Sequence, residues 1–271
     1  MIEEICFLFN QTYNIQPRPI LKKVLIIAYY WPPAGGPGVQ RWLKFVKYLP
    51  DFGIQPVVYV PENPTYPIVD EGLLEEVSDK AIIIKKKILE PYGYASFFSK
   101  KNTKKISSGI IPNQKKQSFI QKMLLWVRGN MFIPDARVLW VKPSVAFLEK
   151  YIAENNIETI ITTGPPHSLH LIGLELKQKL SINWMADFRD PWTTIGYHKA
   201  LKLSDSASKK HKDLESKVLN SADTILVTSE TTKLEFQALT TKPIEVITNG
   251  FDVEKVEKQP LDEKFTIAHI G

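Results

Sequence analysis

Residues 22–49 read KKVLIIAYYWPPAGGPGVQRWLKFVKYL, and this stretch decides the fold. It begins within Leu21–Tyr30, an apolar run of the length of a strand. Apolar residues near its end recur at the i, i+3, i+7 and i+10 positions of an amphipathic helix. These residues are Val39, Trp42, Val46 and Leu49. The glycines and prolines of residues 31–41 lie between the two, so the stretch predicts a strand, a tight turn and a helix.

The turn contains three glycines, Gly35, Gly36 and Gly38. Glycine accepts a positive φ and lets the backbone approach another molecule closely. The start of the following helix offers unpaired N–H groups and the positive end of a dipole. One hypothesis is that the turn holds a phosphate-bearing ligand. The alternative is an ordinary turn between a strand and a helix.

The alternation of strand and helix continues through the chain. Further strands are predicted at residues 54–60, 81–85, 157–163, 183–188, 224–228, 244–248 and 265–271. Helical segments separate most of them, which predicts an α/β, doubly wound, Rossmann-like parallel sheet with ligands beyond the strand C-terminal ends. Residues 132–140 have no clean period and are interpreted as a connector that lies over a cleft.

Composition excludes several classes of protein. The 271 residues are 44% hydrophobic and 24% charged, as in globular domains, and the single cysteine excludes an internal disulfide and suits a reducing compartment. No zinc-protease, serine-hydrolase, P-loop or Cys/His motif is present, so no metal is predicted. The turn lacks G-x-G-x-x-G spacing, which argues against a dinucleotide cofactor. The N-terminus does not resemble a signal peptide, and we expect a cytoplasmic protein.

The net charge of +6 is unevenly placed, with seven lysines and no acidic residue in residues 100–122. Such a run fits an anionic membrane surface or an acidic ligand, and it lacks the aromatic residues typical of single-stranded nucleic-acid binding. The run is interpreted either as a solvated loop or as a peripheral membrane contact. Nucleic acid is not an expected partner.

Chemically useful residues follow two other predicted strands, in TTGPPHS (162–168) and DFRDPW (187–192). Together with the glycine turn, they are expected at one edge of the sheet. His167 could act as a hydrogen-bonding or acid–base group, or it could be a helix-start histidine without a role. His170, three residues later, is expected to be of the second kind. In DFRDPW, an aspartate could orient a hydroxyl, and Arg189 could meet a phosphate or pair with its neighbours.

The stretch at 22–49, taken with IITTGPPHS, ADFRDPW and VITNGFD, resembles the N-terminal half of GT-B glycosyltransferases of the retaining family 4. The resemblance covers residues 22–271. It implies two Rossmann-like domains that face each other across a cleft. The N-terminal domain mostly binds the acceptor, and the C-terminal domain binds the nucleotide-sugar donor. The family's paired-glutamate donor motif has no match here.

The resemblance also implies functional residues. Gly35 and Gly36 would lie near the donor phosphates or the acceptor, and His167 would touch the transferred sugar. The implied catalytic residues are His167 and Asp190. The implied substrate-binding residues are Gly35, Gly36, Arg41, Asp187, Arg189 and Trp192.

The expected organisation has three parts. Residues 1–20 form an N-terminal extension, residues 21–255 a Rossmann-like acceptor-binding domain, and residues 256–271 a linker and the first strand of a truncated donor domain. The expected function is transfer of a sugar from a nucleotide sugar to a saccharide or lipid-linked acceptor, in surface polysaccharide assembly, with this fragment inactive alone. The alternatives are a non-catalytic Rossmann-like module for a phosphorylated ligand and a nucleotide-sugar epimerase of GT-B architecture.

Overall fold

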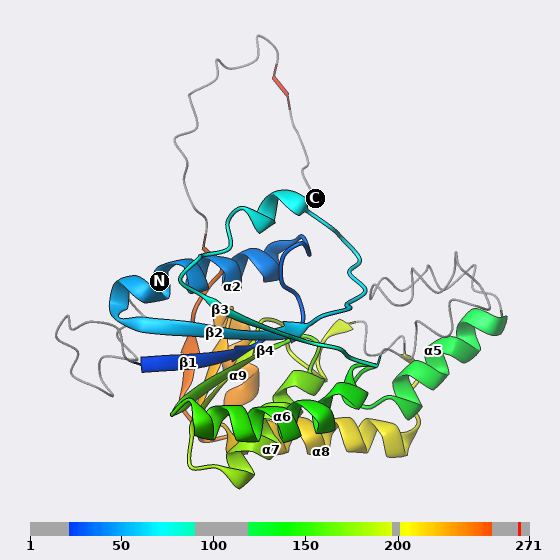
Figure 1. Ribbon diagram of the computed structural model, residues 1–271. Helices are drawn as coiled ribbons and strands as arrows, with labels where there is room; N and C mark the ends of the chain where they lie inside the picture. The colour runs from blue at the N-terminus through cyan, green and yellow to red at the C-terminus, as the bar shows by residue number, and fades with distance from the viewer. Residues whose placement is uncertain (1–21, 90–118, 197–200, 251–264, 267–271) are drawn as a thin grey trace.

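A computed structural model describes residues 22–89, 119–196, 201–250 and 265–266 (Figure 1). The strands in these residues all pair in parallel, in the order β3-β2-β1-β4-β5-β6-β7. Their bounds are β1 Lys22–Ile27, β2 Ile54–Pro61, β3 Ile82–Lys86, β4 Thr159–Gly164, β5 Asn183–Phe188, β6 Thr224–Val227 and β7 Ile244–Val246. The predicted parallel sheet is therefore confirmed.

Helices follow most of the strands in the chain. They are α2 Pro37–Tyr48, α5 Phe119–Met131, α6 Val141–Glu154, α7 Ser168–Lys179, α8 Asp205–Ser221 and α9 Glu230–Gln237. Short 3-10 turns occur at η1 Leu49–Phe52, η2 Glu71–Leu74 and η4 Val138–Trp140. In the described part of the chain, every helix is too short or too polar to cross a membrane.

Each face of the sheet carries its own hydrophobic core, because the side chains of a strand alternate between faces. Val24 and Ile26 of β1 pack in the cluster that contains Trp42 of α2. Leu25 and Ile27 pack in the second cluster, with residues from α6, α7 and α8. Figure 1 shows α2 on one side of the sheet and these three helices on the other. The doubly wound arrangement predicted from the sequence is confirmed.

The strand order reverses at β1. It pairs on one side with β2, where Ile27 lies opposite Tyr59, and on the other with β4, where Ile27 lies opposite Thr162. In open sheets of this kind, ligands bind where the order reverses, outside the strand C-terminal ends. The segments that leave this point are residues 28–36 and 165–167. They contain the glycine turn and His167, so the topology brings these two predicted features to one place.

Residues 132–140 were predicted to be a connector rather than a core element, and this was wrong for the four buried residues Ile133, Ala136, Arg137 and Trp140. Trp140 is only 1% exposed, and its ring stacks on Tyr59 at a centroid distance of 5.4 Å. An indole ring buries a large apolar area, and the 3-10 turn η4 directs it inward before α6 begins. Asp135 keeps a surface role, because its carboxylate accepts hydrogen bonds from the backbone N–H and hydroxyl of Ser168 at the start of α7.

Several predictions fall outside the described residues. They include the extension at 1–20, most of the basic run at 100–122 and most of the segment 256–271. Of the predicted last strand, 265–271, only residues 265 and 266 are described, and neither belongs to a strand. The sequence also predicts a short helix at residues 71–77, and the structure has the 3-10 turn η2 there.

A core substitution tests the packing of α6. Leu148 is completely buried, so Leu148→Ala leaves a cavity and is expected to lower the free energy of unfolding by about 2–5 kcal/mol. Leu234 of α9 is 67% exposed, and Leu234→Ala is expected to change the free energy of unfolding by less than about 0.5 kcal/mol. Urea denaturation followed by circular dichroism measures both. Equal losses in the two variants would contradict this packing.

Candidate functional site

The loop after β1 is fastened to the segment that follows β2. The N–H of Gly35 donates to the carbonyl of Ile68 at 3.0 Å, and the N–H of Asp70 donates to the carbonyl of Pro33 at 2.7 Å. A Cβ on Gly35 would lie 2.9 Å from a methyl carbon of Ile68. The loop therefore has a fixed position at the edge of the sheet.

Gly36 directly precedes α2 and has φ +105° and ψ 168°. Only glycine adopts this conformation without strain. A Cβ on Gly36 would meet no atom within 4 Å, so this part of the backbone borders open space. The first turn of α2 contains no acidic residue and receives no hydrogen bond from a capping side chain. The positive end of the helix dipole is thus not neutralised by the helix itself.

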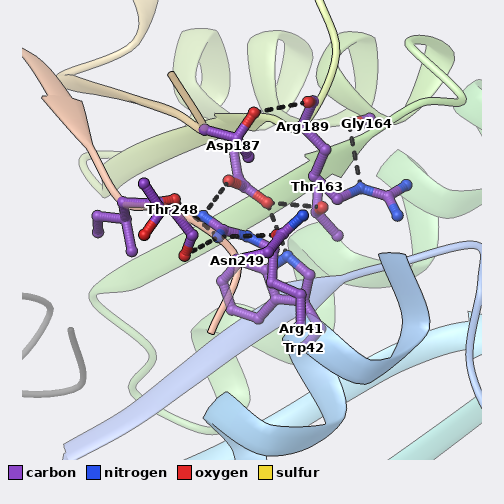
Figure 2. Close-up of polar contacts among 10 residues, drawn as sticks. Arg41, Trp42, Thr163, Gly164, Asp187, Arg189, Thr248 and Asn249 are labelled. Carbon is purple, nitrogen blue, oxygen red and sulfur yellow. Dashed lines mark hydrogen bonds and ion pairs between the residues drawn. The ribbon is translucent and has the colours of Figure 1, made fainter. Parts of the chain in front are cut away.

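Arg189, directly after β5, lies against the start of α2. Its Nε donates to the carbonyl of Gly164 at 3.3 Å (Figure 2), and its Nη2 donates to the carbonyl of Pro165. A Cβ on Gly38 would lie 1.7 Å from Nη1, so only glycine at position 38 leaves room for this guanidinium. Burial lowers the pKa of Arg189, and the nearby carboxylates oppose this change. The described residues contain no ion pair between Arg189 and a carboxylate.

Asp187 of β5 is completely buried, and its carboxylate accepts hydrogen bonds from three side chains (Figure 2). Trp42 Nε1 donates at 2.7 Å, Thr163 Oγ1 at 2.8 Å and Arg41 Nη2 at 3.1 Å. Burying a carboxylate is costly unless it is paired and hydrogen-bonded, and this one is both. The two contacts from Arg41 and Trp42 hold α2 against the end of β5, and the contact from Thr163 joins β4 to β5.

Arg41, the cation of this pair, also binds the chain that leaves β7. Its Nη1 donates to the carbonyl oxygens of Ile247 at 2.8 Å and Thr248 at 3.1 Å, and to Oδ1 of Asn249 at 3.3 Å. The side chains of Arg41 and Asp187 are almost completely buried, at 1% and 0% exposure. Both were predicted to bind substrate, and the structure shows them bound to protein groups.

His167 and Trp192 pack against each other at the same edge of the sheet. His167 is the residue before α7, and its ring lies parallel to that of Trp192 at a centroid distance of 5.0 Å. Both side chains are buried. Asp190, two residues before Trp192, is exposed. The structure therefore gives the two predicted catalytic residues different surroundings, with His167 in a packed stack and Asp190 at the surface.

Comparison with known proteins identifies the chain. A family model described as Glycosyltransferase Family 4 matches residues 110–255, more than half of the sequence. The chain belongs to glycosyltransferase family 4. The match contains TTGPPHS and DFRDPW but not the glycine turn. The predicted relationship to this family is confirmed.

Solved structures with a similar fold include two of Phytolacca americana UGT2. The one complexed with UDP-2fluoro-glucose and pterostilbene is 10% identical, with a TM-score of 0.47 over 86% of this chain and 55% of that chain. The apo structure is 12% identical, with a TM-score of 0.44 over 83% and 51% of the two chains. Spinosyn rhamnosyltransferase SpnG, complexed with thymidine diphosphate, is 10% identical, with a TM-score of 0.34 over 76% and 45%. The family 4 chain thus spans about half the length of these proteins. No curated protein matches its sequence significantly.

His170 of the family 4 domain is a packing residue, as its position in the sequence suggested. It is completely buried, stacks on Phe188 at 4.2 Å, and places Nδ1 2.8 Å from Oγ1 of Thr162. Burial lowers the pKa of His170 to about 3. Within the described residues, no cluster of three or more His, Cys, Asp or Glu side chains could hold a metal ion.

Two residues of α8, His211 and Glu215, are not among the site residues predicted from the sequence. Both are buried, and they bond to Trp192 and Thr193 of the loop after β5. Glutamate is rarely buried without a partner. The signal in the sequence was their spacing, because i and i+4 residues share one face of a helix.

Removal of the Asp187 carboxylate tests its structural role in the family 4 domain. Asp187→Ala leaves the charge of Arg41 buried without its partner, and we expect the free energy of unfolding to fall by about 3–5 kcal/mol. The matched control is Glu154→Ala, because Glu154 forms an exposed pair with Lys150 at 3.6 Å. The control should lose less than about 1 kcal/mol. Chemical denaturation measures both variants, and a loss in Asp187→Ala no greater than in the control would contradict this role.

His170 makes stability depend on pH. Above its ordinary pKa of 6.5 the imidazole is neutral in both folded and unfolded chains, and below that pH only the unfolded chain takes up the proton until about pH 3. The free energy of unfolding should therefore fall as the pH drops below 6.5, with this group contributing up to about 1.4 kcal/mol per pH unit. His170→Gln should flatten this slope. His211 contributes in the same direction and remains in the variant, so an unchanged slope would contradict the assignment to His170.

Proposed function

We propose that this domain is the acceptor-side half of a retaining, metal-independent hexosyltransferase. The enzyme moves a sugar from a nucleotide sugar to a saccharide or lipid-linked acceptor, as in surface polysaccharide assembly. The observation that supports the proposal best is the meeting of Gly36, Arg189 and the start of α2 where the strand order reverses.

The chemistry of this edge favours a phosphate-bearing ligand. The start of α2 carries a positive partial charge that no acidic side chain of its first turn offsets. Arg189 lies beside it, and its hydrogen bonds go to the neutral carbonyl oxygens of Gly164 and Pro165. The carboxylates of Asp187 and Asp190 act on this charge, but neither forms an ion pair with Arg189 among the described residues, so we assign the guanidinium to a phosphate-bearing ligand. Fixed positive groups of this kind stabilise the charge that develops as a sugar–phosphate bond breaks.

The remaining predicted residues receive two kinds of role. We assign Asp190, which is exposed, to orient an acceptor hydroxyl, and His167 to hydrogen-bond the transferred sugar. Gly35 and Gly36 form the backbone wall of the ligand site. Three other residues support the site, since their side chains are hydrogen-bonded to other protein groups: Arg41, Asp187 and Trp192.

A peripheral membrane contact is part of the proposal. Residues 100–122 carry seven lysines without an acidic residue, and most of them lie outside the described part of the chain. The helix α5, which begins within this run at Phe119, exposes Met123, Trp126 and Met131 by about half or more. Lysines and exposed apolar residues suit the surface of an anionic membrane. We place the protein in the cytoplasm, at the inner face of the membrane, with nucleic acid excluded as a partner.

Binding of UDP-glucose tests the ligand site. A Cβ at Gly36 would strain the backbone and enter the open space beside the loop, so Gly36→Ala should weaken binding at least about tenfold, or 1.4 kcal/mol. Arg189→Gln should do the same by removing a positive charge. Gly196→Ala is the control, because a Cβ there also meets no atom but the residue has no positive φ. Titrations followed by NMR suit weak binding, and equal affinity in Gly36→Ala and the control would exclude the loop.

The same chain should transfer no sugar by itself, because the proposal gives this domain only contacts to the donor phosphates and assigns the rest of the donor site to a second domain. Incubation with a panel of nucleotide sugars and a saccharide acceptor, followed by product detection, measures this. Robust turnover by residues 1–271 would contradict the division between acceptor and donor domains.

A further inference from the structure

Two buried side chains of α8 hold the loop that follows β5. They are His211 and Glu215, and we call them the α8 clamp. Their partners, Trp192 and Thr193, lie just beyond Asp190 in the loop. The proposed function gives neither member of the clamp a role, although both are almost completely buried.

His211 binds the indole of Trp192. Trp192 Nε1 lies 3.1 Å from Nδ1 of His211, and an indole N–H can only donate. Nδ1 is therefore the acceptor, and the proton of the neutral ring is on Nε2, which faces the carbonyl of Gly129 in α5 at 3.5 Å. Burial lowers the pKa of His211, which favours this neutral form. The histidine thus bridges the loop and α5.

Glu215 binds the next residue of the loop with both carboxylate oxygens. Oε1 accepts from the backbone N–H of Thr193 at 3.1 Å, and Oε2 accepts from its hydroxyl at 2.5 Å. Hydrogen bonds to a carboxylate are stronger than those between neutral groups. Two consecutive loop residues are therefore fixed by two residues one turn apart on the same face of α8.

The α8 clamp contacts Trp192, and Trp192 in turn stacks on His167. The two rings are parallel within 1° at a centroid distance of 5.0 Å. Trp192 can hold this position only while its own loop is held. On the other side of the stack, His167 is carried by the turn between β4 and α7. The ring of His167 therefore takes its orientation partly from a contact that begins on α8.

The α8 clamp also restricts the backbone of Asp190. On one side of Asp190 in the chain, Arg189 is bonded to the carbonyl oxygens of Gly164 and Pro165. On the other side, Trp192 is bonded to His211. Asp190 is thus exposed but lies between two anchored neighbours, which restricts the conformations open to its backbone.

We propose that His211 and Glu215 are positioning residues, which hold Trp192 against His167 and fix the place of Asp190. This proposal rests on the proposed function in one respect, that His167 and Asp190 face the substrates. The geometry of the clamp itself does not depend on any ligand.

NMR of the histidine rings in the full chain tests the proposal, because the chain has only five histidines. A proton above the face of an indole ring is shifted upfield, so the ring protons of His167 should resonate upfield of an unstacked histidine. Glu215→Ala and His211→Phe should remove most of this displacement. Glu215→Gln keeps an acceptor for the Thr193 N–H, so it should keep part of the upfield displacement of the His167 protons. His167→Gln assigns the signal.

A gentler variant and a matched control complete the experiment. Thr193→Val removes only the hydroxyl that Glu215 binds, and it should reduce the displacement even if the α8 variants do not fold. Glu235→Ala removes the exposed hydrogen bond from Thr194 and should leave the His167 signals unchanged. Unchanged His167 signals in Thr193→Val and in folded Glu215→Ala would overturn the proposal.

Binding of UDP-glucose to the same variants separates the two proposals. If both are right, Glu215→Ala should weaken binding as it moves the His167 signals. If the signals move while UDP-glucose binds to no form of the chain, the clamp stands and the proposed function fails. If binding is strong in the unmodified chain and the signals stay fixed in every folded clamp variant, the clamp fails and the proposed function stands.

Discussion

Asp187 places a carboxylate where water does not reach, and donors from two other elements surround it. Thr163 belongs to β4, while Arg41 and Trp42 belong to α2. A buried charge in such a place is tolerated only when paired and hydrogen-bonded, so these elements must stay together as long as Asp187 is ionised. The start of α2 is thereby held beside the ends of β4 and β5, and Gly36 and Gly38 take their positions from this contact.

The two arginines near Asp187 differ in the groups that pair with their positive charges. Arg41 is buried against the carboxylate and against carbonyl oxygens of the chain after β7. Arg189 lies at the edge, where its guanidinium is bonded to carbonyl oxygens and fills the space that Gly38 leaves. The buried charge of Arg41 is thus paired with Asp187, while Arg189 forms no ion pair with a carboxylate among the described residues. A family 4 domain that binds a phosphate-bearing donor or acceptor would need this distribution.

The sheet and most of its helices could be predicted because the spacing of apolar side chains along the chain indicates strands and helices locally. The sequence also placed the glycine turn, TTGPPHS and DFRDPW at one edge of the sheet, because parallel strands end together. It did not separate Asp187 from Asp190, which look alike in DFRDPW although one is buried in a strand and the other is exposed. The partners of Asp187 in α2 lie about 145 residues away in the chain, and no local pattern reports them. Trp140 and the pair His211 and Glu215 were missed for the same reason, since their roles depend on elements that meet only in the folded chain.

Arg41 joins two regions that the chain order keeps far apart. It lies one helical turn after Gly38, and its guanidinium holds residues 247–249 where the chain leaves the sheet. An α-helix is stiff over one turn, with a rise of about 1.5 Å per residue. A displacement of the chain at Asn249 should therefore be felt by the guanidinium of Arg41 and, through α2, by the glycine turn. Arg41 thus couples the point where the chain leaves the sheet to the proposed ligand-binding edge, over less than two helical turns.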